Sequence, residues 1–176
     1  MGLNMWYLVN LSASALEAQN AVPRLRAWLE TTGWAGAERE PDWVEGLCLT
    51  PGPRPLEHGH ALPTSNLTLI HGRDSYSMGE NFGPPPCPVC REVLDEDILF
   101  EAYSDWSDND WTLEMQPYVS CDSCGEERPV LDFADENSRM AHGDLAIALY
   151  EWDHQDLFAA VQENFPGHWR AICSHT

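Results

Sequence analysis

Two short stretches, Cys87-Pro-Val-Cys90 and Cys121-Asp-Ser-Cys124-Gly125, decide how the middle of this 176-residue chain folds. Two residues separate the thiols in each stretch, so that one tight turn directs both sulfurs at a common ion. Two such turns supply the four ligands of a tetrahedral shell. The pattern predicts one closed, structural metal site formed by Cys87, Cys90, Cys121 and Cys124. Zinc is the expected ion, and iron is the alternative because it accepts the same four-sulfur ligand set.

Residues 85–128 resemble the zinc-ribbon class, in which each CxxC turn sits on a β-hairpin. The resemblance implies that the metal, rather than a large apolar core, folds this segment. Gly125 suits the position after the second turn, where the backbone often needs a positive φ angle. Arg91 occupies the equivalent position after the first turn, where such turns often have glycine. Between the turns, residues 98–100 and 111–119 are predicted to be strands of a hairpin, joined by an acidic turn at 105–110.

On both sides of this segment the sequence alternates between strand-like and helix-like stretches. Residues 5–11 and 67–71 are predicted to be buried strands. Ser14-x-x-Glu17 is a capping box, which predicts that a helix begins there. Residues 144–151 have helical character, and a second helix is predicted over 153–164, followed by a last strand at 168–173.

This order of elements predicts an α+β fold, in which helices cover one face of a mainly antiparallel sheet and a zinc-ribbon-like metal segment is inserted. A ferredoxin-like core with the inserted segment is one concrete form of that fold. We expect residues 1–82 and 131–176 to be two parts of the same α+β domain. Residues 83–130 are expected to form the insert.

The chain is strongly acidic, with 29 acidic and 9 basic side chains and a formal net charge of −20. Such a field repels phosphate backbones and anionic lipid headgroups and attracts basic proteins. Direct nucleic-acid binding and membrane association are therefore not expected. The alternative is that the acidity serves solubility alone. No stretch is predicted to span a membrane or to be a signal peptide, which favours the cytoplasm, where thiols stay reduced and available to a metal.

Acidic and aromatic side chains alternate between the two cysteine pairs. Aromatic side chains anchor protein interfaces, whereas carboxylates pair with arginine or lysine of a partner. Carboxylates spaced along a rigid scaffold can also imitate a phosphate backbone. The alternative is a solvated hairpin whose aromatic side chains pack on its own sheet. The predicted partner-binding residues are Asp95, Glu96, Asp97, Glu101, Asp105, Trp106, Asp108, Asp110 and Trp111.

Common catalytic motifs are missing from the sequence. It contains no phosphate-binding loop, nucleophile elbow, metalloprotease helix or dinucleotide fingerprint, and a closed four-sulfur shell has no open position for hydrolysis. A non-catalytic protein that binds a basic protein partner is therefore the favoured function. In size, charge and lack of catalytic motifs, the chain is similar to small acidic bacterial immunity proteins, which neutralise a toxin such as a nuclease.

Two other classes of function stay open. One is a zinc-ribbon accessory factor in transcription or translation that acts through protein contacts. The other is a metallo- or redox enzyme of unfamiliar type. The sequence identifies neither the partner nor the oligomeric state.

Overall fold

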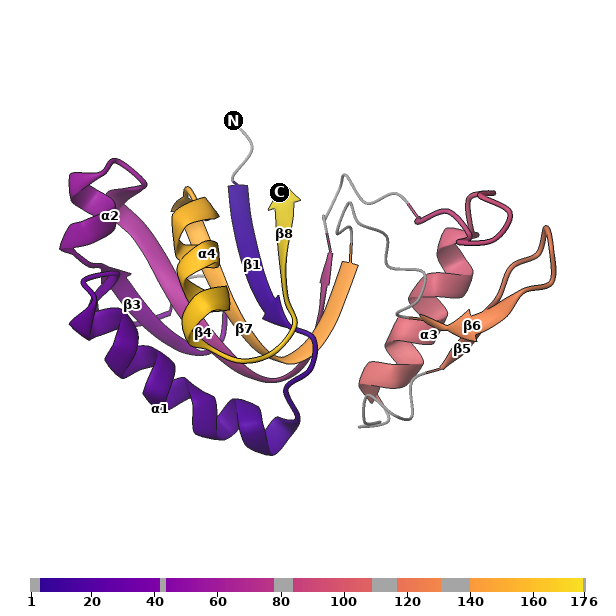
Figure 1. Ribbon diagram of the computed structural model, residues 1–176, viewed down its shortest axis with the longest axis horizontal. Coiled ribbons are helices and arrows are strands. Elements are labelled where there is room, and N and C mark those ends of the chain that lie inside the picture. Colours follow the sequence, from indigo (N-terminus) through magenta and orange to yellow (C-terminus); the bar gives the residue numbers. More distant parts are fainter. Residues whose placement is uncertain (1–3, 42–43, 78–83, 109–116, 131–139, 176) are drawn as a thin grey trace.

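The computed structural model describes residues 4–41, 44–77, 84–108, 117–130 and 140–175. Figure 1 shows a sheet with helices and, to one side, a smaller segment built from α3, β5 and β6. In chain order the elements are β1 (Asn4–Asn10), α1 (Ala15–Thr31), β2 (Ala35–Glu38), β3 (Leu47–Pro51), α2 (Pro53–Glu57), β4 (Ala61–Ser77), α3 (Glu96–Asp108), β5 (Tyr118–Ser120), β6 (Glu127–Pro129), β7 (Met140–Trp152), α4 (Gln155–Asn164) and β8 (Trp169–His175). None of the described helices is both long and apolar enough to cross a membrane.

The main sheet has six strands in the order β2-β3-β4-β7-β1-β8, and each pair of neighbours is antiparallel. Four of these strands, β8-β1-β7-β4, have the order and the helical crossovers of the ferredoxin-like fold, with α1 following β1 and α4 following β7. Both helices pack on the same face. The predicted α+β class, with a mainly antiparallel sheet and helices on one face, is therefore confirmed.

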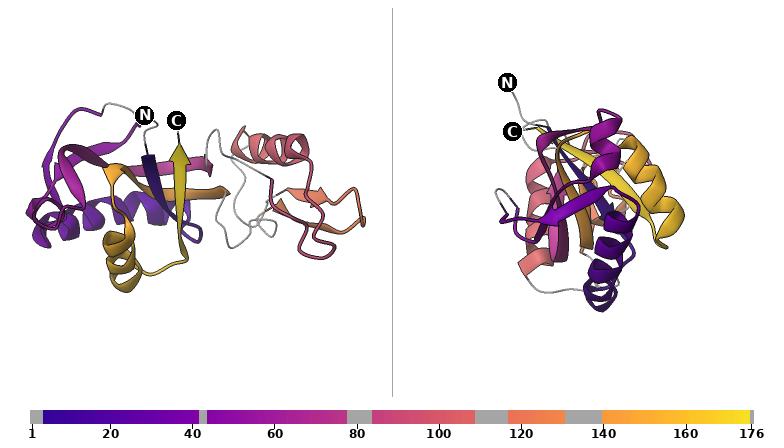
Figure 2. Two further views of the ribbon diagram at one scale, coloured as in Figure 1. Left: turned by 90° about the horizontal axis from the view of Figure 1, so that it is seen from above. Right: turned by 90° about the vertical axis from the view of Figure 1, so that its left-hand side faces the viewer.

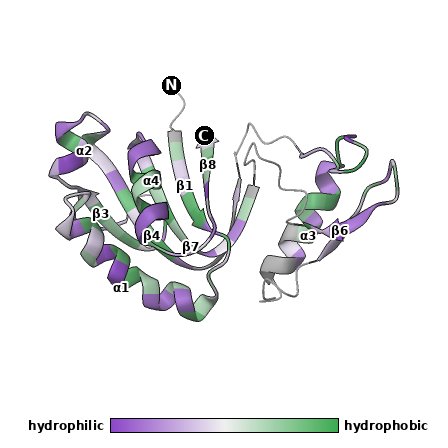
Figure 3. Cartoon of the chain, in the orientation of Figure 1, coloured by the Kyte–Doolittle hydropathy of each residue, from purple (hydrophilic) through white to green (hydrophobic). Residues whose placement is uncertain are grey.

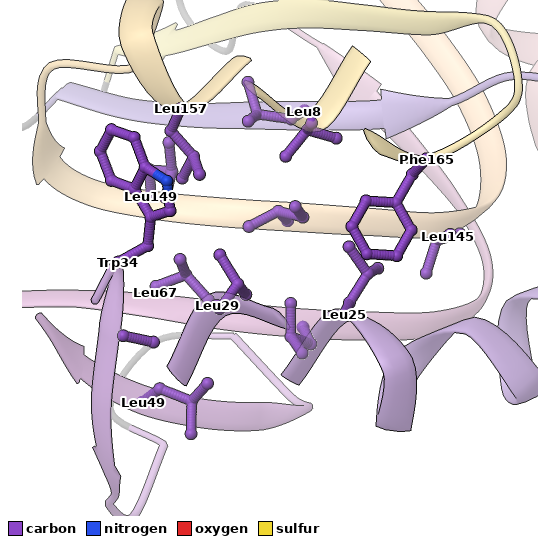
Figure 4. Close-up of a cluster of buried hydrophobic side chains, with 14 of the residues drawn as sticks. Leu8, Leu25, Leu29, Trp34, Leu49, Leu67, Leu145, Leu149, Leu157 and Phe165 are labelled. Carbon is purple, nitrogen blue, oxygen red and sulfur yellow. The ribbon is translucent and has the colours of Figure 1, made fainter. Parts of the chain in front are cut away.

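The core lies between this face and the two helices. Leu25 and Leu29 of α1 meet Leu145 and Leu149 of β7 and Leu157 of α4, and all of these side chains are buried (Figure 4). Alternate residues of β7 point to the same face because side chains change sides at each step of a strand. The apolar spacing of both helices thus turns one stripe of each toward the sheet.

The start of α1 follows from the capping box that the sequence predicts. The backbone N–H of Glu17 donates to the Ser14 hydroxyl at 3.4 Å, and the N–H of Ser14 donates to the Glu17 carboxylate at 2.9 Å. These two bonds satisfy backbone donors that have no partner within the helix. The helix then continues through Pro23 to Thr31 as one element.

Residues 144–151, predicted to be helical, lie in β7, so that prediction was wrong. The alanines at 146 and 148 favour a helix in isolation. In the fold they lie on one face of the strand, while Leu145, Ile147 and Leu149 lie on the other. Pairing with β1 on one side and β4 on the other outweighs the local preference.

β4 and β7 bend together beyond the point where β7 stops pairing with β1. A bulge in β4 between His71 and Asp74 marks the bend, and Gly72 there has a φ angle of 115°. Gly143 lies opposite in β7. A Cβ atom on Gly143 would lie 2.7 Å from the carbonyl oxygen of Asn10. The close approach of the β7 backbone to the end of β1 therefore requires glycine at this position.

The bent ends of β4 and β7 cover the sheet face that the helices leave uncovered. β4 there comes close to β8, although β7 and β1 separate the two strands in the sheet. Tyr76 packs against Tyr7 with ring centroids 5.0 Å apart. The chain between the two strands contains residues 84–130, hereafter the metal segment, which lies beyond their ends (Figures 1 and 2).

Candidate metal centre

The thiol sulfurs of Cys87, Cys90, Cys121 and Cys124 lie within 4.8 Å of one another. The Sγ atoms of Cys87 and Cys124 are 3.8 Å apart, and those of Cys90 and Cys121 are 3.6 Å apart. Each of these distances joins one CxxC turn to the other, so the two turns face a common centre. The four residues that the sequence predicts as ligands are therefore brought together.

The first CxxC turn, residues 87–90, closes a short hairpin. The backbone N–H of Cys87 donates to the carbonyl of Glu92 at 2.8 Å, and the N–H of Arg91 donates to the carbonyl of Cys87 at 2.9 Å. A bridge between Pro86 and Val93 flanks the turn. These bonds hold the two thiols of the turn on the same side of the backbone.

The second CxxC turn, residues 121–124, has the same hydrogen bonds. The N–H of Cys121 donates to the carbonyl of Glu126 at 2.8 Å, and the N–H of Gly125 donates to the carbonyl of Cys121 at 2.7 Å. The paired strands β5 and β6 flank this turn. Both turns are thus built on hairpins, as the resemblance to zinc ribbons implies.

The residue after each turn adopts the left-handed conformation. Gly125 has a φ angle of 73°, and Arg91 has a φ angle of 67° at the equivalent position. Glycine takes this conformation without a steric penalty, whereas an L-residue with a Cβ atom is strained by it. Arg91 therefore differs from the usual glycine in sequence but has the same backbone conformation as Gly125, because each hairpin imposes that conformation on the residue after its turn.

The sulfur arrangement fits a tetrahedral metal ion. Zinc–sulfur bonds of about 2.3 Å at tetrahedral angles place the sulfurs about 3.8 Å apart. The two distances across the cluster, 3.6 and 3.8 Å, agree with that value. A disulfide would require about 2.05 Å. The cluster is therefore compatible with a metal ion such as zinc and not with two disulfides.

The pKa values of two of the cysteines are shifted in opposite directions. The N–H groups of Cys90 and Val89 donate to the Cys87 sulfur and lower the pKa of that thiol to about 7. The N–H of Glu92 acts likewise on Cys90, yet burial and the other thiols raise the Cys90 pKa to about 12. Four crowded thiols cannot all ionise together unless a cation offsets their charge. The chemistry of the cluster therefore also favours a cation.

A small core supports the cluster. Its buried members are Cys87, Leu94, Leu99, Val119, Cys121 and Val130. Two of these described members, Cys87 and Cys121, are themselves candidate metal ligands, so the cysteine cluster is part of this core. Cys90 is half-buried and Cys124 is exposed, which leaves one side of the cluster next to solvent.

The residues between the two turns form a helix and not the predicted hairpin. Residues 98–100 lie inside α3, so the strand predicted there was wrong. Asp95 caps this helix, because its side chain accepts a bond from the N–H of Asp97 at 2.9 Å. Leu94, Ile98 and Ala102 recur at intervals of four and pack on the small core, which is the spacing of a helix.

Other parts of the predicted hairpin fall partly on residues that the structure does not describe. The predicted acidic turn at 105–110 begins in the last turn of α3, and its last two residues lie outside the described residues. Of the predicted strand at 111–119, only the end belongs to a strand, β5, and residues 111–116 lie outside the described residues.

The predicted partner-binding residues cluster on α3 as far as they are described. Asp95, Glu96, Asp97, Glu101 and Asp105 are all exposed, at the start of the helix and along it. Hydrophilic and hydrophobic positions alternate along α3 (Figure 3). Trp106 and Asp108 belong to α3, but their side chains lie outside the described part. Asp110 and Trp111 lie outside the described residues altogether.

Two features of this surface were not predicted from the sequence. Large apolar side chains of the metal segment are exposed: Val93 and Tyr118 are each 65% exposed, and Phe100, next to Glu101 in α3, is 41% exposed. A cavity of about 240 Å³ also lies between the start of α3 and the second turn. It is lined by Val93, Leu94, Asp95, Ile98, Ser120, Cys121, Asp122 and Ser123. The helical spacing of residues 94, 98 and 102 could have indicated the helix, but no local pattern indicates the cavity.

In the α+β domain, His60 lies close to two carboxylates, those of Asp153 and Asp156. The Nε2 atom of His60 is 3.0 Å from the Asp156 carboxylate, and its Nδ1 atom is 3.6 Å from that of Asp153. Both carboxylates are exposed, and these contacts join the turn after α2 to the start of α4. A second cavity, of about 310 Å³, lies instead at the start of α1 beside Asn10. Neither of these two cavities is lined by His60, Asp153 or Asp156.

Comparison with known proteins gives no match for this chain. No protein-family model matches it, and neither does a curated protein or a solved structure. The interpretation of the site therefore rests on its own geometry and chemistry.

Proposed function

We propose that this chain is a non-catalytic binding protein that neutralises a basic protein partner, such as a toxin nuclease, as an acidic immunity protein does. One structural zinc ion would hold the metal segment. The observation that carries the proposal is the row of exposed carboxylates on α3, which begins directly beside the four-cysteine cluster. A rigid helix that presents charge to solvent suits recognition better than catalysis.

Zinc suits this role better than iron. Both ions accept four thiolates in a tetrahedron. Zinc has no redox chemistry, and in a closed four-sulfur shell it contributes folding free energy only. In the proposed function Cys87, Cys90, Cys121 and Cys124 hold the ion, and the ion in turn fixes the position of α3.

Charge supports a basic partner. The metal segment contains 12 acidic residues and 2 arginines, a formal net charge of −10 out of −20 for the whole chain. Such a field accelerates the encounter with a positively charged surface. Exposed Phe100, next to Glu101 in α3, would supply an apolar contact that anchors an interface.

The experiment compares two variants that remove the same charge. One replaces Glu96, Asp97, Glu101 and Asp105 by their amides, and the other replaces the exposed Glu40, Glu45, Glu57 and Glu163 of the α+β domain. The zinc-loaded full chain is used to isolate its partner from the source cells, and association rates are measured at low and high salt. For a nuclease partner, inhibition of the nuclease is measured as well.

We expect a stoichiometric basic partner whose association with the α3 variant at low salt is slower by about tenfold, with little change for the matched control. Equal effects of both variants would show that α3 is not the contact surface. Absence of a basic partner would contradict the proposal itself. A ribosomal or polymerase subunit as partner would favour the accessory-factor alternative instead.

A further inference from the structure

The 240 Å³ cavity beside the metal centre has two kinds of wall. Val93, Leu94 and Ile98 supply apolar surface, whereas Asp95 and Asp122 supply carboxylates that are exposed to solvent. Ser120, Cys121 and Ser123 complete the lining. A ligand that fits must therefore combine an apolar stem with a cationic end.

We propose that this cavity receives the side chain of one arginine of the partner, an inference that rests on the proposed function. The three methylenes of arginine would lie against the apolar wall, as long basic side chains do at protein surfaces. The planar guanidinium has five donors, enough to bond both carboxylates and a serine hydroxyl at once. Bonds between guanidinium and carboxylate are also among the strongest hydrogen bonds in proteins.

Other classes of ligand fit the lining less well. A divalent cation has less support, because the group of three or more potential metal ligands found among the described residues is the cysteine quartet, whereas the cavity has two carboxylates. An anion would find no arginine, lysine or histidine in the lining. Lysine has a single point of charge and would pair with one carboxylate rather than bridge two.

The acidic side of the cavity is held in place before a partner arrives. Asp95 is fixed by its bond to the N–H of Asp97, because it caps α3. Cys121, a candidate metal ligand, forms part of the wall and lies next to Asp122. Preorganised groups lose less conformational entropy on binding. The cavity should consequently keep its shape only while the metal holds the second turn.

The test uses amide NMR spectra of the zinc-loaded full chain, titrated with N-acetyl-arginine methylamide. Two related compounds serve as controls. The citrulline counterpart has the shape of arginine without its charge, and the lysine counterpart has a positive charge without the planar guanidinium group. The test variant is Asp95→Asn/Asp122→Asn. Asparagine keeps the helix cap that Asp95 provides, so the fold is preserved. The matched control, Glu57→Gln/Glu163→Gln, removes the same charge from exposed positions of the α+β domain.

We expect saturable shifts of the Val93, Ile98 and Ser123 amides with the arginine probe alone. Affinity should fall at least about tenfold in the test variant and change less than about twofold in the control. Equal binding of the lysine probe would overturn the assignment to arginine. Shifts that never saturate, or that weaken equally in both variants, would overturn the cavity as the site.

The inference and the proposed function fail in different ways. If the α3 amide variant loses the partner while Asp95→Asn/Asp122→Asn binds the arginine probe and the partner normally, the inference is wrong and the function stands. If the cavity binds arginine but the chain has no basic partner, the proposed function is wrong.

Discussion

The α+β domain and the metal segment differ in the size of their buried cores. Among the residues that the structure describes, the main core contains 20 buried residues, drawn mostly from two helices and six strands, whereas the core of the metal segment contains six, two of which are cysteines. Burial of apolar surface can account for the first region. For the second region we infer that metal coordination supplies much of the stability. The chain would then combine a self-sufficient domain with a segment that depends on its metal.

The two regions also differ in how densely they are charged. Half of the formal net charge of the chain falls on the metal segment. Repulsion among these carboxylates opposes a compact state. In the proposed function the same negative charge would attract the basic partner, and the metal would offset the repulsion.

Metal removal should have the largest effect. The variant Cys121→Ser/Cys124→Ser is expected to lose the metal and to unfold the metal segment, since structural zinc sites contribute on the order of 10 kcal/mol to folding. Hydrogen exchange should show lost protection in α3, β5 and β6, with β1, β7 and α1 unchanged. Cys173→Ser, outside the cluster, is the control. Lost protection throughout the sheet would show that the two regions fold as one unit.

A substitution in the main core should destabilise the α+β domain and leave the metal content unchanged. Leu149 is fully buried between the sheet and the helices, and Leu149→Ala is expected to destabilise the domain by about 2–5 kcal/mol through the cavity it leaves. Urea unfolding measures this loss. The metal content of the folded variant should stay at the wild-type level. Loss of metal under conditions where the variant is still folded would contradict the independence of the two regions.

Substitutions at the residue that follows each CxxC turn should change the zinc affinity in opposite directions. Arg91→Gly relieves the left-handed strain and is expected to stabilise the metal-bound form by about 1 kcal/mol, or roughly fivefold in zinc affinity. Gly125→Ala should weaken binding by a similar factor, because a Cβ there meets no atom within 4 Å and the backbone alone is strained. Competition with a chelator measures both affinities. A change of the same sign in both variants would contradict the equivalence of the turns.

The smallest effect concerns pH in the α+β domain. The His154 ring stacks on Trp6 with centroids 3.6 Å apart, and burial lowers the His154 pKa, partly offset by Asp153. The unfolded chain therefore binds the proton first, so stability is complete above about pH 6.5 and falls as the pH drops below it. Urea unfolding of Cys121→Ser/Cys124→Ser excludes metal loss as a cause. Adding His154→Gln to this variant should reduce the slope of the unfolding free energy against pH. An unchanged slope would show that other groups cause the pH dependence.

Features determined by local sequence could be predicted. The capping box at Ser14 and Glu17 and both CxxC turns depend on residues within a few positions of one another, and each has the expected geometry. The alternation of strands and helices around one core then leads to the α+β class.

Features that depend on tertiary context could not be predicted in the same way. Residues 144–151 form a strand because two neighbouring strands pair with them. The cavity beside the metal centre joins residues 93–98 to residues 120–123, which the small core and the cysteine cluster bring together. Residues 94–102, by contrast, already had the spacing of a helix, so the helix α3 could have been predicted.

The most direct measurement is native mass spectrometry of the purified full chain. Coordination by Cys87, Cys90, Cys121 and Cys124 predicts one zinc ion per chain, lost completely in Cys121→Ser/Cys124→Ser and retained in Cys173→Ser. A wild-type chain that folds without any metal, or that binds zinc equally well in the double variant, would contradict the metal centre.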